Sequence, residues 1–387
     1  MPATSCFGDA PLGDCPGYRA RRPAPPSPRS SAQRHRIASP RSSAHRLRSV
    51  TSIGLVLSAG GASARAYHAG TLAGIAAETG WDARTAELII GTSAGSAAAA
   101  FLRAGLSPPD DLARYVGSPV SAAGQALLDR VRTPGPPMAP LPDPNGGRLL
   151  RPSLIARGIT RRAALVASVS GLLPRGQWDG APMGQRVRDV WGDKWPEQPT
   201  WICAVRVRDG KRVVFGRDDV ETPDIGTASQ ASCAVPRVVR PVRIGHDEFI
   251  DGATHSSTNA DLVVPLAFDL VVIVSSMTAV PAVADFTPRA PMIMWYSRVL
   301  AREVAMIRRS GAEVLVVQPT RVDLEVRRGE DPTAAIATQA AQTVRANLAR
   351  PEARRSVDLL ARGAADLPAR GAVANLAAAS SVSTAAR

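Results

Sequence analysis

The sequence has few cysteines, aromatic residues and histidines for a chain of 387 residues. Its four cysteines form no Cys-x-x-Cys pair and no Cys/His spacing typical of a zinc site, so we expect no metal, no other cofactor and no disulfide framework. Aromatic residues make up 4% of the chain and do not alternate with arginines, which gives no support for stacking on nucleic-acid bases. We therefore expect no nucleic-acid partner.

The sequence also lacks any uninterrupted apolar run long enough to cross a membrane. The most apolar stretch, residues 262–284, is broken by Asp269 and by two prolines. The N-terminus has no continuous apolar segment followed by a small-residue cleavage site, as a signal peptide would have. We expect a soluble, cytoplasmic protein, and a peripheral contact with membranes stays open.

The formal net charge is +14, and the basic residues are nearly all arginine. About half of this charge falls in residues 1–50, where nine arginines face only Asp9 and Asp14. Residues 1–49 are rich in Pro, Ser, Ala and Arg and have too few large apolar side chains to offset chain entropy by burial. We predict a disordered basic arm that either contacts anionic membranes or has no function.

The remaining chain contains short apolar segments separated by helix-length segments, which is typical of a wound α/β sheet. The predicted strands span residues 53–57, 88–90, 201–207, 212–215, 248–251, 270–275 and 314–318. The predicted helices span residues 66–78, 97–102, 161–173, 183–191, 228–234 and 334–349. We predict one domain over residues 50–350 and a C-terminal tail over residues 351–387.

Residues 106–161 are rich in proline and glycine, which predicts a long irregular insertion. Long irregular insertions in compact domains are usually functional segments such as lids. We predict that residues 106–195 form a cap or lid.

The segment 88–102 carries the strongest motif. An apolar run ends in Gly91-Thr92-Ser93-Ala94-Gly95 and continues into an alanine-rich segment, so it predicts a strand, a sharp turn and a helix. A serine at the top of such a turn has a strained backbone and an accessible hydroxyl, and the flanking glycines avoid collisions with neighbouring backbone. Ser93 is therefore the candidate nucleophile.

The first predicted strand leads into a second glycine-containing turn at residues 58–64. Such turns present backbone N–H groups to an anion, either a phosphate or the oxyanion of acyl transfer. The segment matches neither of the two common nucleotide-binding patterns, so a nucleotide site is weakly supported.

A serine nucleophile needs a base, which in α/β-hydrolases is a histidine that follows the acidic residue. After Asp251 only His255 remains, so a separate C-terminal histidine loop is excluded. The remaining solution is a Ser/Asp dyad of Ser93 and Asp251, in which burial raises the proton affinity of the carboxylate. Asp251-Gly252 also fits an ordinary turn at a strand end, and an esterase that uses His68, His246 or His255 stays open as an alternative.

Four segments resemble, in order and approximate spacing, the motifs of patatin-like phospholipases. They are LVLSAGG at 55–61, GTSAG at 91–95, ASCAVP at 231–236 and DGA at 251–253, and the resemblance extends from about residue 51 to 320. It implies a three-layer α/β/α fold, a Ser93/Asp251 dyad, an oxyanion hole from Gly60, Gly61 and Ala62, and hydrolysis of acyl esters in phospholipids or related lipids.

Two alanines depart from the family pattern. Ala59 and Ala64 stand where the family usually has glycine, and an alanine with a positive φ would cost on the order of 1 kcal/mol. Asn259 and Asp261 are similar to the family's Asn-Pro-[VI] segment without its proline. A degenerate, non-catalytic scaffold that binds membrane surfaces is therefore a further alternative.

Overall fold

The computed structural model describes residues 50–135, 175–218, 220–279, 290–327 and 332–366. The chain divides into two units, Met1–Arg41 and Ser42–Arg387, and every described residue belongs to the second. The predicted arm over residues 1–49 lies outside the described residues. So do the middle of the predicted cap, residues 136–174, and the end of the predicted tail, residues 367–387.

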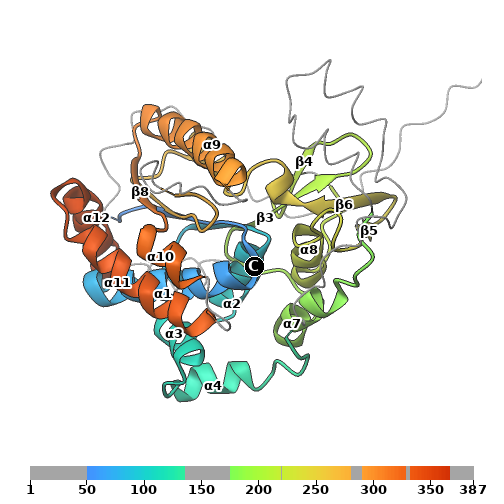
Figure 1. Cartoon of the computed structure of the whole chain (residues 1–387), viewed down its shortest axis with the longest axis horizontal. Helices are drawn as coiled ribbons and strands as arrows, with labels where there is room; N and C mark the ends of the chain where they lie inside the picture. Colours follow the sequence, from blue (N-terminus) through green and yellow to red (C-terminus); the bar gives the residue numbers. More distant parts are fainter. Residues whose placement is uncertain (1–49, 136–174, 219, 280–289, 328–331, 367–387) are drawn as a thin grey trace, which may run out of the picture. The chain divides into compact units, whose positions relative to one another are not determined.

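The described part of the second unit is built around one sheet of eight strands, shown in Figure 1. The strands are β1 (Ile53–Leu57), β2 (Leu88–Thr92), β3 (Thr200–Arg206), β4 (Arg212–Phe215), β5 (Val242–Ile244), β6 (Asp247–Asp251), β7 (Leu270–Val274) and β8 (Glu313–Val317). β8, β7, β1, β2 and β3 pair in parallel in that order. β4 and β6 are antiparallel to β3, and β5 is antiparallel to β6.

The described helices are α1 (Gly61–Thr79), α2 (Ala94–Arg103), α3 (Pro108–Val116), α4 (Ala122–Leu128), α7 (Ala181–Trp191), α8 (Ile225–Ser232), α9 (Ala290–Arg309), α10 (Arg321–Val326), α11 (Thr333–Leu348) and α12 (Arg354–Ala365). Figure 1 shows α9 on one side of the sheet and α1, α2 and α11 on the other.

Alternate side chains of each central strand enter two separate cores, as the period of two in a strand requires. Leu55 and Leu57 of β1 pack in the core below α1, α2 and α11, whereas Val56 packs in the core below α9. All five residues of β1 and of β7 are buried, which explains their continuous apolar sequences. The predicted three-layer α/β/α fold is confirmed.

The segment after α2 differs from the prediction of an irregular insertion, because residues 108–128 contain α3 and α4. The side chain of Ser107 caps α3 by accepting a hydrogen bond from the Asp110 N–H at 3.2 Å. Pro108 and Pro109 occupy the first turn, where a missing N–H removes no intrahelical hydrogen bond. Prolines that indicated a loop therefore begin a helix.

Other helices also differ from the prediction. α1 begins at Gly61 rather than near residue 66, so the turn after β1 is shorter than residues 58–64. α12 lies in the segment 351–387, for which no helix was predicted, and its Leu360 is fully buried. The Asp366 carboxylate after α12 accepts a hydrogen bond from the Thr51 N–H at 2.7 Å, which ties this end of the chain to the start of β1.

Candidate active site

Ser93 lies between the end of β2 and the start of α2, with φ 53° and ψ −118°. A non-glycine residue rarely adopts a positive φ, so the turn is strained at the serine. The Ser93 N–H donates to the Ser232 hydroxyl at 2.8 Å, and that hydroxyl donates to the Cys203 carbonyl at 2.6 Å. Ser93 is 5% exposed, so the expected open hydroxyl is in fact largely covered.

The two glycines that flank Ser93 are needed for close packing. A Cβ at Gly91 would lie 2.6 Å from the Gly95 carbonyl oxygen, and one at Gly95 would lie 2.0 Å from the Leu57 carbonyl oxygen. Neither glycine has a positive φ. Their role is therefore to let the turn, α2 and β1 approach one another without side chains between them.

Strand β3 brings Ser93 and Asp251 together. Cys203 pairs with Thr92 of β2 on one side and with β4 on the other, and the next residue, Ala204, pairs with Asp251 of β6 and with β4. Since β4 takes the same edge of β3 throughout, β2 and β6 share the opposite edge. Thr92 and Asp251 are the last residues of β2 and β6, and they pair with consecutive residues of β3. Ser93 directly follows Thr92.

Asp251 is 3% exposed, and burial raises its pKa to about 6. Hydrogen bonds from the Ala253 N–H and from the Ser93 side chain act in the opposite direction. The Ala253 N–H lies 2.8 Å from Asp251 Oδ1. A Cβ on Gly252 would lie 2.3 Å from the Cys203 carbonyl oxygen, so the glycine allows the Asp-Gly turn to pass close to β3.

The glycine turn after β1 lies beside the Ser93 turn, because Leu57 at the end of β1 pairs with Gly91 in β2. Gly60 and Gly61 have φ values of 140° and 66°, and α1 begins at Gly61 without a side-chain cap. Gly61 and Ala62 are exposed. The first N–H groups of a helix have no intrahelical acceptor, so this turn can accommodate an anion.

The two alanines at positions where the family usually has glycine cause no backbone strain. Neither Ala59 nor Ala64 is among the described residues with a positive φ, and Ala64 lies inside α1. The Ala59 N–H donates to the Ser257 carbonyl at 2.8 Å, and the Ala59 carbonyl accepts from the Ser276 hydroxyl at 2.8 Å. The expected cost of alanine at a positive φ therefore does not arise.

The three histidines considered as alternative bases, His68, His246 and His255, do not have the position and pKa expected of a catalytic base. His68 is fully buried in α1, and burial together with the charge of Arg65 lowers its pKa to about 3. Burial also lowers the pKa of His255 to about 4, and the Arg212 charge acts in the same direction. His246 is exposed in the turn between β5 and β6. Within the described ranges, none of these three side chains forms a hydrogen bond with Ser93.

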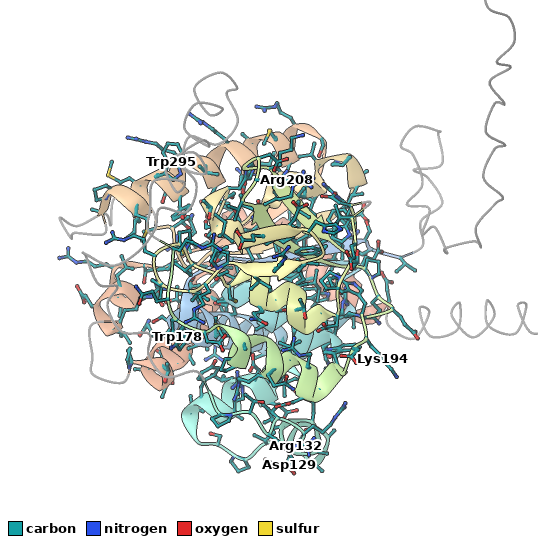
Figure 2. All side chains as sticks on the ribbon, turned by 90° about the vertical axis from the view of Figure 1, so that its right-hand side faces the viewer. Asp129, Arg132, Trp178, Lys194, Arg208 and Trp295 are labelled. Atoms are coloured by element: carbon teal, nitrogen blue, oxygen red, sulfur yellow. The ribbon has the colours of Figure 1, made fainter. Side chains whose placement is uncertain are left out.

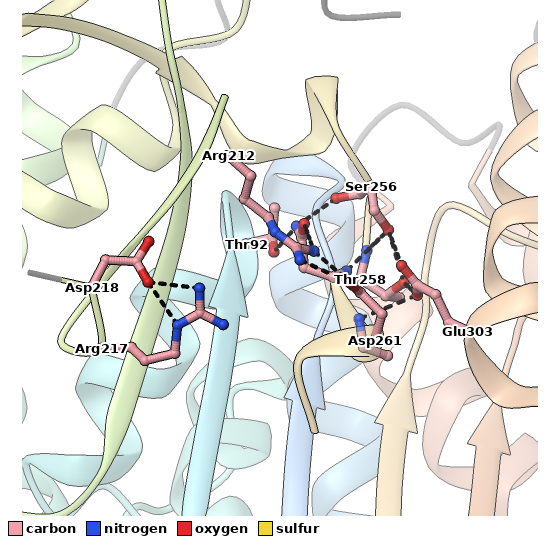
Figure 3. A network of polar contacts seen from close by, with 10 residues as sticks. Thr92, Arg212, Arg217, Asp218, Ser256, Thr258, Asp261 and Glu303 are labelled. Carbon is pink, nitrogen blue, oxygen red and sulfur yellow. Dashed lines mark hydrogen bonds and ion pairs between the residues drawn. The ribbon is translucent and has the colours of Figure 1, made fainter. Parts of the chain in front are cut away.

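The segment after Asp251 is held by a buried carboxylate on α9, shown in Figure 3. Glu303 accepts hydrogen bonds from the Ser256 hydroxyl at 2.7 Å, from the Thr258 hydroxyl, and from the Ala260 N–H at 3.2 Å. Glu303 is 4% exposed, and burial raises its pKa to about 7 against the effect of these hydrogen bonds. Glu303 lies in none of the sequence motifs described above. The sequence feature that could have indicated Glu303 is its position among the buried, otherwise mainly apolar residues of α9.

A second set of contacts connects the same segment to β2 and β4. The Asn259 amide donates to the Thr92 hydroxyl at 3.1 Å, next to Ser93, and its carbonyl oxygen accepts from Arg212 at 3.2 Å. Arg212 also pairs with both carboxylate oxygens of Asp261, at 2.6 and 2.8 Å (Figure 3). Asn259, which the sequence indicated only by similarity, therefore braces the strand that carries the serine, and Asp261 holds the arginine that contacts Asn259.

Cys233 lies next to the serine turn. Its thiol is 4.0 Å from the Ser96 hydroxyl, and burial, with the nearby Asp251 charge, raises its pKa to about 12. A thiol with so high a pKa stays protonated and is a poor nucleophile at neutral pH. The neighbouring hydroxyl of Ser232 binds the Ser93 backbone, which gives the segment 231–236 a role in holding the turn.

The sequence profile described as patatin-like phospholipase matches residues 55–264, which is more than half of the chain and includes both Ser93 and Asp251. The chain belongs to the patatin-like phospholipase family. This membership supports lipid acyl hydrolase activity in general. Among solved structures, the chain is similar to VipD from Legionella pneumophila, with a TM-score of 0.35 and 12% identity over 78% of this chain and 67% of that chain. No curated protein sequence matches the chain.

The part of the chain that the structure describes contains no cluster of three or more His, Cys, Asp or Glu side chains that could bind a metal ion. None of the described helices has the length and apolar character that a bilayer crossing requires.

Proposed function

We propose that this protein hydrolyses acyl ester bonds of phospholipids or related lipids, with Ser93 as the nucleophile and Asp251 as the general base. The observation that carries the proposal is the pairing of β3, whose consecutive residues Cys203 and Ala204 contact Thr92 and Asp251. A strained serine turn and a buried carboxylate thus meet at one point of the sheet.

The electrostatics of Asp251 suit a general base. A carboxylate with an ordinary pKa is a weak base, and a pKa of about 6 brings its proton affinity closer to that of imidazole while leaving it mostly ionised at neutral pH. Because His68 and His255 have pKa values lowered to about 3 and 4 by burial, and neither is bonded to Ser93, a histidine-dependent mechanism has less support.

In the proposed reaction, Ser93 Oγ attacks the ester carbonyl carbon while its proton passes to the Asp251 carboxylate. The tetrahedral intermediate collapses, the bond to the leaving alcohol breaks, and the protonated Asp251 returns the proton to that alcohol oxygen. The acyl group then stays on Ser93 until a water attacks it. Asp251 takes a proton from this water as the oxygen attacks the acyl carbon. When the Ser93 Oγ–acyl bond breaks, Asp251 gives this proton to Ser93 Oγ, which releases the fatty acid and restores both the serine and the carboxylate.

The negative charge that develops on the ester oxygen needs donors close to Ser93. The N–H groups of Gly60, Gly61 and Ala62 are the proposed donors, since they lie at the start of α1 and follow the strand that pairs with β2. The partial positive charge at a helix N-terminus favours an anion at this position. The hydrogen bond from Ala59 to Ser257 fixes the start of this turn against the segment that follows Asp251.

A fluorophosphonate probe tests the nucleophile, because it forms a covalent bond only with an activated hydroxyl. We expect the wild-type chain to be labelled at Ser93, and the Ser93→Ala variant to stay unlabelled. Release of fatty acid from phospholipid vesicles by the wild-type chain then tests the substrate class. A wild-type chain that takes no label would favour the non-catalytic scaffold, and labelling that disappears in His255→Gln would favour a histidine-dependent esterase.

A further inference from the structure

The first turns of α9 expose large apolar side chains next to the candidate active site. Met292, Met294 and Trp295 are 42%, 43% and 37% exposed. Among the described residues, the other exposed large apolar side chains are the isolated Val116, Val235 and Val322. Figure 2 labels Trp295 on this helix. Three neighbouring exposed side chains of this size form an apolar patch, which we call the α9 patch, and such patches mark interaction sites.

The opposite face of α9 anchors the patch to the site. The Tyr296 hydroxyl, which follows Trp295 directly, donates to the Ala253 carbonyl at 3.1 Å, and the Ala253 N–H binds Asp251. One helical turn later Leu300 is buried, and Glu303 then holds the segment after Asp251. The α9 patch therefore lies on the same rigid helix that positions the proposed base.

The exposed charges of α9 have one sign. After the patch, the exposed face carries four arginines and no acid, because Glu303 is buried; they are Arg298, Arg302, Arg308 and Arg309. The apolar face of α9 is packed on the protein, so only its exposed end can enter a bilayer. Tryptophan is enriched at membrane–water interfaces, and clustered arginines are attracted to anionic lipid, so an apolar end followed by arginines suits an anionic membrane surface. A partner with a basic or neutral polar surface would not complement these charges.

We propose that α9 docks this protein on an anionic phospholipid bilayer, with Met292, Met294 and Trp295 in the interfacial region and Arg298 and Arg302 at the lipid phosphates. This inference rests on the proposed lipid substrate and names the surface from which the site takes it. Docking through α9 brings the Asp251 side of the active site to the membrane.

Fluorescence quenching tests the insertion of Trp295 in the full chain. The vesicles contain equal amounts of phosphatidylcholine and phosphatidylglycerol, with bromine atoms on the acyl chains to quench nearby tryptophans. Residues 1–49 contain no tryptophan, so binding through the arm alone gives no signal from that segment. We expect quenching of the wild-type chain, and loss of most of that quenching in Trp295→Phe. Equal quenching of both chains would overturn the proposal.

Vesicle flotation tests the contribution of the patch to affinity. We expect Met292→Asp/Met294→Asp to weaken binding about tenfold or more, since the variant loses buried apolar area and anionic lipids repel the two aspartates. Aspartates are favourable in the first turns of a helix, so the variant should fold, and its thermal unfolding curve checks this. Val322→Asp is the matched control, because Val322 is 49% exposed on α10 and lies outside the patch. Equal binding by the two variants would contradict the proposal.

Replacing Arg298 and Arg302 by glutamine tests the choice of partner. We expect binding to anionic vesicles to weaken about fivefold for each arginine, with little change on pure phosphatidylcholine. Sedimentation of the wild-type chain without lipid tests the competing occupant, a second copy of the chain. A dimer that Met292→Asp/Met294→Asp dissociates would overturn the membrane assignment. None of these measurements needs turnover, so they stay informative if the fluorophosphonate test of the active site fails.

Discussion

The turn that carries Ser93 depends mainly on close backbone packing, whereas the segment that follows the Asp251-Gly252 turn is held mainly by side-chain hydrogen bonds. At the first, Gly91 and Gly95 allow backbone atoms to approach to distances that no Cβ permits. At the second, the carboxylate of Glu303 and the amide of Asn259 fix residues 256–260. Packing of this kind tolerates no side chain, while a polar network tolerates substitutions that keep its donors and acceptors. The two parts of the site should therefore respond differently to mutation.

The largest effect is expected from Ser93→Ala, which removes the proposed nucleophile and leaves the turn in place. Hydrolysis of a short-chain p-nitrophenyl ester should fall by roughly 10⁴-fold or more. The thermal unfolding curve should change little, because alanine keeps the backbone N–H that binds Ser232. Activity that survives the substitution would mean that a different residue attacks the ester.

Asp251→Asn should lower activity by roughly 10²–10⁴-fold, the range that a general base contributes. In the wild-type chain, kcat/KM should decline below a pH of about 6 as Asp251 becomes protonated. A decline at this pH is not expected from His255, whose pKa is lowered to about 4. His255→Gln is the control and should keep most of its activity. If it loses as much as Asp251→Asn, the base is the histidine.

Gly95→Ala tests the packed side of the comparison. The added methyl group would lie 2.0 Å from the Leu57 carbonyl oxygen, so β1 and α2 must separate, at a cost of more than about 3 kcal/mol in the free energy of unfolding. Gly135→Ala is the matched control, since nothing lies within 4 Å of the added atom and φ is not positive. Urea unfolding of the two variants gives the difference. Similar stability of the two would show that the turn can open without cost.

The same contrast explains what the sequence allowed us to predict. The strand, turn and helix around Ser93 could be predicted because the turn needs a local pattern of glycines, and the buried strands could be predicted from their continuous apolar residues. The role of Ser93 as nucleophile stays a prediction. Glu303 was missed because its main partner Thr258 is 45 residues away, and no local pattern links the two. The start of α3 was missed because Pro108 and Pro109 are read as loop residues unless the capping role of Ser107 is considered. A steric requirement at a turn can be recognised from neighbouring residues in the sequence. A hydrogen-bond network between residues far apart in the sequence cannot.

Glu303→Ala tests the polar side of the comparison. It leaves the Ser256 and Thr258 hydroxyls and the Ala260 N–H without their buried acceptor, which should lower the free energy of unfolding by about 2–3 kcal/mol and reduce kcat. The exposed Glu325, paired with Arg321 at 3.2 Å, offers a control, since Glu325→Ala should cost less than about 1 kcal/mol. Equal losses in the two variants would mean that the network carries no more stability than a surface ion pair.

Glu303→Gln separates the charge of Glu303 from its hydrogen bonds. Glutamine can still accept from Thr258 and Ala260 and donate to Ser256, so most of the stability lost in Glu303→Ala should return. The folded pKa of Glu303 is raised from 4.5 to about 7, so between these values the unfolded chain binds fewer protons than the folded chain. By linkage, the free energy of unfolding should fall as pH rises through this window, by on the order of 2 kcal/mol. Glu303→Gln lacks this contribution, and subtracting the two curves removes that of Asp251, which has the same sign. Urea unfolding of both chains at pH 5 and pH 8 measures the difference, and parallel curves would contradict a buried carboxyl that titrates near neutrality.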